Sequence, residues 1–218
     1  MLQDLAPNLT KGILVTAPIL SSLLPPRVVV FQYNPTELTR EISPNYDEND
    51  NRTLGFTGPA TETISLTAIF DATEDLIKGG VSGIVAETLG IFGQLSSLQL
   101  MVYPSVANSV KNALEAAAGT IEISAADVPL TVFAWGIKRI VPVKLTSMTI
   151  TEQAFDSALN PIRAQVAISM QVLSDNDVKA TSSEYALYLA HQTAQEVMAT
   201  AGTTKSIVQL PSVVSSLI

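Results

Sequence analysis

The side chains that most often carry catalysis are few and scattered in this sequence. The single histidine, His191, has no cysteine, Ser-Asp pair or second histidine at a spacing that suits a triad or a metal site. We interpret it as a packing or solvent-facing residue. Glu62 and Glu152 flank predicted strands and could pair as acid and base, but solvated carboxylates at strand ends are far more common. The sequence thus predicts no catalytic residue, metal or cofactor.

Two short motifs resemble functional loops but fail at the positions that matter. Residues 47–51 match the D-x-N-x-N start of a calcium loop, yet Arg52 stands where that loop needs glycine and Gly58 where it needs a bidentate glutamate. Residues 80–83 lack the G-x-S-x-G spacing of a nucleophile elbow, and no phosphate-binding glycine motif occurs. We interpret the first as a solvated loop tip and the second as a turn or helix start.

Composition points to a buried surface. The chain has 218 residues, a net charge of −8 and no cysteine, which excludes disulfides and thiolate zinc sites. Its basic residues form no run of three, so nucleic acid is not an expected partner. Only 15% of residues are charged, against about 25% in a typical soluble protein. We expect a subunit whose surface is largely covered by copies of itself or by neighbours.

A membrane protein would share this low charge. The uncharged stretch 88–110 is the best candidate span, but Gly, Gln, Ser and Asn residues and Pro104 interrupt it, whereas a spanning helix needs about 20 predominantly apolar residues. The N-terminus shows neither the basic region nor the apolar core of a signal peptide. We therefore predict no membrane insertion and assembly in the cytoplasm.

The elements around these residues are mostly strands. Apolar or alternating segments predict strands over residues 12–18, 27–33, 37–42, 62–70, 130–135, 137–151 and 161–173. The alternation slips within 137–151, which indicates a bulge near Thr146 and Ser147. The strand at 130–135 is apolar on both faces, so we expect it to be covered on both sides. Residues 43–60 are rich in Asn, Asp, Gly and Pro and predict a long loop or the tip of an extended hairpin.

Helices are expected in an insertion over about residues 72–118 and near the C-terminus. The insertion predicts one helix near 83–101 and another near 105–118, with Ser105 as N-cap and Gly119 just beyond the end. Residues 182–201 predict a helix capped by Ser182 or Ser183, followed by a flexible tail over 202–218. Its apolar stripe consists of Tyr185, Tyr188, Leu189, Val197 and Met198.

Three segments together resemble a known family. The first is F-Q-Y-N-P-T-E from Phe31 to Glu37, and the second is E-T-I-S-L from Glu62, which runs to Phe70-Asp71. The third is P-L-T-V-F-A-W-G from Pro129 to Gly136, followed by residues 143–155 and by N-P-I-R-A from Asn160. In this order, over about residues 10–175, they resemble the N-terminal domain of contractile injection system tube proteins. These are tube-initiator or baseplate-adaptor subunits of phage-tail-like particles. The residues that carry the fold signature are Phe31, Trp135, Gly136, Pro161 and Arg163.

The resemblance implies a mainly β, α+β fold: a tube-like β-barrel or sandwich over residues 1–175, with the helical insertion, and a C-terminal helix and tail over 176–218. It implies a non-enzymatic ring, most simply a homohexamer, between the spike and the tube. Its partners would be its own copies, the spike or hub protein, the adjacent tube ring and baseplate proteins. The implied interface residues are Tyr33, Asn34, Pro35, Glu37, Arg40, Tyr46, Arg52 and Phe56.

Residues 176–218 lack the LysM module that many family members carry, which favours a plain tube-layer role over a clamp. The particle would assemble in the bacterial cytoplasm, with or without later release. Two alternatives stay open. One is another tail tube or hub protein with a different placement, and the other is a monomeric β-rich binding module.

Overall fold

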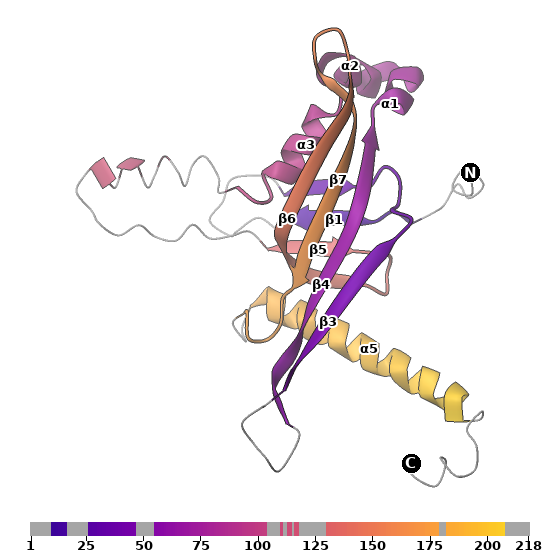
Figure 1. The fold of residues 1–218 in the computed structure, drawn as a ribbon, viewed down its shortest axis with the longest axis vertical. Coiled ribbons are helices and arrows are strands. Elements are labelled where there is room, and N and C mark those ends of the chain that lie inside the picture. The colour runs from indigo at the N-terminus through magenta and orange to yellow at the C-terminus, as the bar shows by residue number, and fades with distance from the viewer. Residues whose placement is uncertain are drawn as a thin grey trace.

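The strands of the described residues form one antiparallel sheet (Figure 1). The computed structural model describes residues 10–16, 26–46, 55–103, 110, 113–114, 116–117, 130–178 and 182–207. The strands run in the order β2-β1-β5-β6-β7-β4-β3 across the sheet. Their bounds are β1 (Ile13–Thr16), β2 (Arg27–Val30), β3 (Leu38–Tyr46), β4 (Phe56–Asp71), β5 (Thr131–Ala134), β6 (Ile140–Phe155) and β7 (Pro161–Val172). The mainly β, α+β fold is confirmed.

A side chain helps to curl this sheet towards a barrel. An isolated bridge joins Tyr33, just after β2, to Ile69 on β4. Beside it, the side-chain amide of Gln32 donates to the carbonyl of Asp71 at 2.7 Å and accepts from the backbone N–H of Asp71 at 2.8 Å. Gln32 thereby pairs with β4 as a strand backbone would, and it brings the two halves of the sheet together.

The core follows the alternation of the long strands. Ile64, Leu66, Ala68 and Phe70 are buried on β4, as the sequence predicts. On β6 the register shifts between Leu145 and Ser147, which confirms the bulge. Because the bulge adds one residue to the strand, Met148 and Ile150 pack against the same core as Val141 and Val143.

An aromatic cluster fills the short-strand side of the core. The ring centroids of Phe31 and Phe133 lie 6.5 Å apart, and those of Phe133 and Trp135 lie 6.0 Å apart. Phe133 is fully buried and Trp135 is half-buried. Gly12 leaves room for the cluster, since a Cβ there would approach Phe31 and Trp135 to 2.6 Å.

The helical insertion differs from its prediction. In place of one helix over 83–101 the structure has α1 (Thr73–Lys78), α2 (Gly80–Leu89) and α3 (Phe92–Gln99), with a 75° bend between α2 and α3. Gly79, Gly80 and Gly90 have positive φ, which breaks the helix at both junctions. The predicted second helix near 105–118, with Ser105 and Gly119, lies largely outside the described residues. No single helix among the described residues has the length and apolarity to cross a membrane, although the bent pair α2 and α3 passes that test jointly.

The hairpin between β3 and β4 is longer than expected. Strand pairing continues to Tyr46 and resumes at Phe56, so the ends of the predicted loop 43–60 are strand, while 47–54 lie outside the described residues. A register shift between Ser43 and Asn45 accommodates Pro44 and Pro59, and a second shift follows between Asn45 and Tyr46. The alternative of an extended hairpin is therefore confirmed for the described part.

The C-terminal helix α5 (Ser183–Ile207) begins at the predicted N-cap, because Ser182 Oγ accepts from the N–H of Tyr185 at 3.3 Å. It runs six residues further than predicted, into the expected tail, and the remainder of that tail lies outside the described residues. The predicted apolar stripe is only partly covered. Tyr185 and Tyr188 are half-buried, but Leu189, Val197 and Met198 are exposed, because the second half of α5 projects beyond the sheet (Figure 1).

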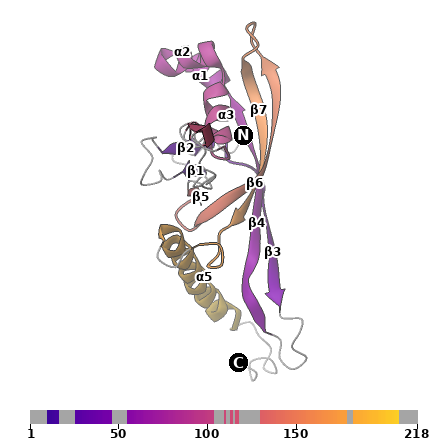
Figure 2. The same cartoon turned by 90° about the vertical axis from the view of Figure 1, so that its left-hand side faces the viewer.

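All other described elements lie on one side of the long strands. Figure 2 shows β1, β2, β5 and the helices on the same face of the sheet formed by β3, β4, β7 and β6. No described element covers the opposite face. The four-stranded sheet therefore has a core face and an open face.

Candidate functional site: an open polar face between two strand edges

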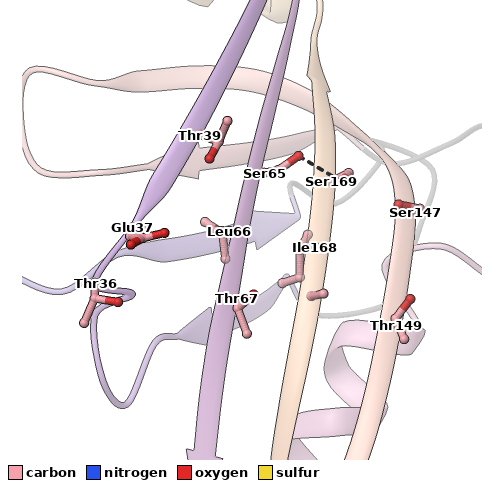
Figure 3. A pocket seen from close by; sticks show the side chains of 11 residues that line it. Thr36, Glu37, Thr39, Ser65, Leu66, Thr67, Ser147, Thr149, Ile168 and Ser169 are labelled. Atoms are coloured by element: carbon pink, nitrogen blue, oxygen red, sulfur yellow. Dashed lines mark hydrogen bonds between the residues drawn. The ribbon is translucent and has the colours of Figure 1, made fainter.

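The open face is lined by small hydroxyl side chains. The strand registers place Thr39, Ser65, Ser169 and Ser147 in one row across β3, β4, β7 and β6. Alternation puts them opposite the buried core residues of the same strands. Figure 3 shows these side chains together with Thr67 and Thr149 on the same face. The row is neutral, polar and four strands wide.

Hydrogen bonds hold this surface in place. The hydroxyls of Ser65 and Ser169 lie 3.0 Å apart, and Thr146, at the bulge, donates from Oγ1 to the carbonyl of Ser169 at 3.0 Å. The residues border a shallow hollow of about 310 Å³. None of its lining residues is aromatic and few are apolar, whereas pockets for small ligands are mostly apolar and concave. A shallow polar hollow of this kind is better suited to a hydrated surface than to binding a small ligand.

Charge is concentrated at the margins of the face, where Glu37 borders the hollow just before β3. One flanking row places Glu41 and Lys144 at its two ends, with Thr63 and Gln171 between them. At the other end of the sheet, Arg163 Nε lies 4.0 Å from a carboxylate oxygen of Asp71. The central rows thus offer hydrogen bonds in all directions without a net charge that would attract or repel an ion.

Both lateral edges of this four-stranded sheet lack a described strand partner. β3 is the last strand of the sheet, so its outer edge is unpaired by any described strand. On the other side, β5 pairs with β6 only as far as Val143, and residues 144–155 extend beyond it. Exposed strand edges are templates for pairing with another chain.

The predicted interface residues fall into two groups. Tyr33, Asn34 and Pro35 are half-buried, and Asn34 pairs with the chain before β1, since its Oδ1 accepts from Gly12 N and its Nδ2 donates to Thr10 O, both at 2.9 Å. This arrangement gives the Y-N-P motif a role inside the subunit. Contact between these residues and a neighbour remains a prediction.

The other predicted interface residues lie along the β3–β4 hairpin. Arg40 Nε is 2.6 Å from Glu62 Oε1, and this hydrogen bond raises the pKa of Arg40. Tyr46 and Phe56 stack at the far end of the hairpin with ring centroids 5.4 Å apart, and both are exposed. Glu37 is exposed at the start of β3, and Arg52 lies outside the described residues.

The signature residues after Phe31 stabilise two turns. Gly136 has a φ of 68° in the β5–β6 turn, which the 2.7 Å hydrogen bond from Trp135 N to Arg139 O closes. In the β6–β7 turn, Pro161 O accepts from Ile91 N at 2.9 Å. Asn160 Nδ2 donates to Asp156 Oδ2 at 2.8 Å, and this bond lowers the pKa of Asp156. The N-P-x-R-A motif thus joins the sheet to the α2–α3 corner.

His191 is half-buried where α5 meets the sheet. Burial lowers its pKa below the ordinary value; nearby Arg40 and Arg139 act in the same direction and Glu62 in the opposite one. Within the described part of the chain, no three His, Asp or Glu residues come together as a metal site would require. The arrangement is that of a packing residue.

Sequence reasoning missed the row of hydroxyl residues and the open edge of β6. The alternation marked these positions as solvent-facing, but their neutral character extends over four strands that are distant in sequence. Only the sheet order brings them together. A count of Ser and Thr at outward positions of every predicted strand would have indicated the surface.

A comparison with known families finds one match. The family model described as contractile injection system tube protein matches residues 22–181, more than half of the chain. No curated protein matches the sequence.

Proposed function

The chain belongs to the family of contractile injection system tube proteins, and from this premise we propose that it forms a closed ring, most simply of six copies, around a central channel. The observation that carries the proposal is the pair of strand edges on either side of the open polar face. The ring follows from repeating one contact between these edges.

Strand direction favours this contact. All neighbours in the order β6-β7-β4-β3 are antiparallel, so β3 runs opposite to β6. β3 of one copy can therefore pair with the 144–155 segment of β6 in the next copy as a further antiparallel pair. The contact is heterologous, and it closes into a ring when its rotation fits a whole number of copies. Strands in such a closed sheet tilt and stagger, so we expect Thr39 of one copy to lie opposite Ser147 of the next copy or opposite a residue up to four positions further along β6.

The open face would then line the channel. In a ring closed through these edges, the helices and short strands lie outside and the Ser and Thr rows lie inside. A neutral, hydrated wall offers weak and interchangeable hydrogen bonds to any molecule that passes through the channel. The observed lack of charge in the central rows supports this orientation.

We further propose that the ring sits at the junction of tube and baseplate and initiates or adapts the inner tube onto the spike. The particle would assemble in the bacterial cytoplasm. The partners are then the spike or hub protein, the adjacent tube ring and baseplate proteins. Family membership supports this placement. So does α5, because a helix outside the sheet is not needed for a channel wall and is available to contact other proteins. Within the same family, the alternative is that the chain forms a different layer of the tube or of the hub.

Cysteine cross-linking tests the ring, because the chain has no native cysteine. Thr39→Cys on β3 is combined in turn with Ser147→Cys, Thr149→Cys or Thr151→Cys on β6. Within one subunit these strands are three spacings apart, roughly 14 Å, beyond the roughly 7 Å limit for a disulfide. Any disulfide therefore joins two copies.

The expected result is a ladder of bands on a denaturing gel of oxidised particles that stops at the ring number. The cysteines should be tested in particles, or after co-expression with neighbouring layers, since the isolated subunit can stay monomeric. Each single-cysteine variant is the control and should not form a ladder. Absence of cross-links from all three pairs in assembled particles would refute the edge contact.

A further inference from the structure

A groove lies beside the free edge of β6, just past the point where β5 stops covering this strand. It has a volume of about 430 Å³ and lies between β6 and the chain at the end of α3. Its apolar and long side chains are Leu145, Met148 and Ile150 on β6 and Gln99, Val102 and Tyr103 on the α3 side. The three β6 residues pack against the core but are only partly buried, and Val102 and Tyr103 are 46% and 61% exposed. The hydrophobic core is therefore open at this edge.

The α3 side of the groove is held in place by contacts with the rest of the subunit. Arg27 Nη1 on β2 donates to Leu100 O at 2.6 Å, and Val102 N donates to Gln99 O at 3.0 Å. Met101, next to both walls, is buried in the core. The groove is thus formed in the single subunit, and a side chain can enter it without a rearrangement of α3.

The other free edge, that of β3, presents an apolar side chain that suits this groove. Alternation places Leu38, Arg40 and Ile42 on the side of the sheet opposite Thr39, which is the core-facing side. Leu38 packs against the core of its own subunit, and Arg40 Nε donates to Glu62 Oε1 at 2.6 Å. Ile42 is 54% exposed. Of these three residues, Ile42 is therefore the apolar one that another chain can cover.

We infer that Ile42 of one copy enters the groove of a second copy and completes its core there. This inference rests on the proposed ring, and it names the side chain that anchors the contact between the two edges. When β3 pairs with β6, the core-facing sides of both strands lie on the same face of the joined sheet. Ile42 then points to the side of Leu145 and Met148, while Thr39 stays on the channel side with Ser147 and Thr149.

The end of β5 limits the register of this pairing. Because the strands are antiparallel, Ile42 lies three positions back along β6 from the partner of Thr39. If that partner were Ser147, the bulge would place Ile42 opposite Val143, which already pairs with Thr131 of β5. With Thr39 opposite Thr149 or Thr151, Ile42 lies opposite Leu145 or Met148, and both of these line the groove. The groove therefore selects a staggered register.

The chain's own segment after Tyr103 is the competing occupant, because it begins at one wall of the groove. The strand edge favours a second copy instead. Unpaired N–H and C=O groups along residues 144–155 can direct another strand to this position, and β3 brings an exposed apolar side chain with it. A segment that filled the groove from the same subunit would leave Ile42 without this contact.

The first experiment compares Ile42→Glu with Val28→Glu, a matched control on β2 at a residue that is 53% exposed. Both are made in the Thr39→Cys background with the β6 cysteine that gives the ladder, and circular dichroism checks that each subunit folds. We expect Ile42→Glu to reduce the cross-linked fraction at least tenfold, because it places a charge in an apolar groove. Val28→Glu and the conservative Ile42→Leu should keep the ladder.

The second experiment tests the contact directly. Ile42→Cys is combined in turn with Leu145→Cys and Met148→Cys, on strands that lie roughly 14 Å apart within one subunit. One of these pairs should form a ladder in oxidised particles, and Ile42→Cys alone should not. In a separate variant, Val102→Cys should react with a maleimide in the isolated subunit and be protected in assembled particles.

The outcomes separate this inference from the proposed ring. If Thr39→Cys gives no ladder with any of its three β6 partners, the edge contact itself is wrong. If a ladder forms only with Ser147→Cys, or if Ile42→Glu cross-links as well as Val28→Glu, the ring stands and the role of Ile42 is wrong. Protection of Val102→Cys already in the isolated subunit would assign the groove to the chain's own segment and also overturn the inference.

Discussion

Replacing Gly90 by alanine should destabilise the subunit more than any other small change at the α2–α3 corner. Gly90 has a φ of 55°, where an L-residue costs about 1–3 kcal/mol. A Cβ there would lie 2.1 Å from Pro161 O, so the corner must move away from the β6–β7 turn. Weakening the hydrogen bond from Ile91 N to Pro161 O costs a further ~0.5–1.5 kcal/mol.

These contributions sum to about 2–4 kcal/mol, or a fall in Tm of roughly 6–12 °C for a chain of this size. Urea unfolding followed by circular dichroism measures the change. Gly93→Ala is the matched control, because Gly93 lies in α3 without positive φ, and apart from its chain neighbours and its own helix backbone no atom lies within 4 Å of the position its new methyl group would take. Alanine there should be neutral or stabilise by up to about 1 kcal/mol. If Gly90→Ala unfolds within about 0.5 kcal/mol of the parent protein, a typical surface effect, the account of this corner is wrong.

Three further predictions use other parts of the fold. Trp135→Ala should cost about 2–3 kcal/mol in urea unfolding, less than the roughly 3–5 kcal/mol of a fully buried Trp, and a fully hydrated Trp135 emission in the assembled parent would contradict its packing. Because burial lowers the pKa of His191, stability should be full above its ordinary pKa of about 6.5 and fall as pH drops below it; melting curves of His191→Gln should lack this loss. Deleting residues 44–59 should leave a folded subunit that no longer assembles, and full-length particles from that variant would contradict the role of the hairpin.

The alternation of apolar and polar residues predicted the strands because the apolar positions of each strand are the ones buried in the core. Every second residue is buried from Ile64 onward on β4 and from Ala164 onward on β7, and the slip near Thr146 marked a real bulge. The Ser182 cap was equally visible, since its hydroxyl acts within one helical turn. These features depend on residues that are close in sequence.

The missed features depend on residues that are distant in sequence. The 75° corner at Gly90 is set by contact with Pro161, about seventy residues further along the chain. The open edge of β6 exists because β5, which pairs with both β1 and β6, begins at Thr131 opposite Val143. Part of the apolar stripe of α5 is exposed because the helix extends past the edge of the sheet. No local pattern contains this information.

The residues that made the family recognisable are mostly used to fold the subunit. Asn34 fixes the chain before β1, Gln32 joins Asp71, and Asn160 fixes the β6–β7 turn. Apart from the hydrogen bond between the hydroxyls of Ser65 and Ser169, the fold makes no such demand on the open face. Core packing requires only that Ser65, Ser169 and their neighbours be polar, and Lys or Glu would satisfy that requirement and improve solubility. The choice of small neutral hydroxyls across four strands is therefore consistent with the channel wall proposed above.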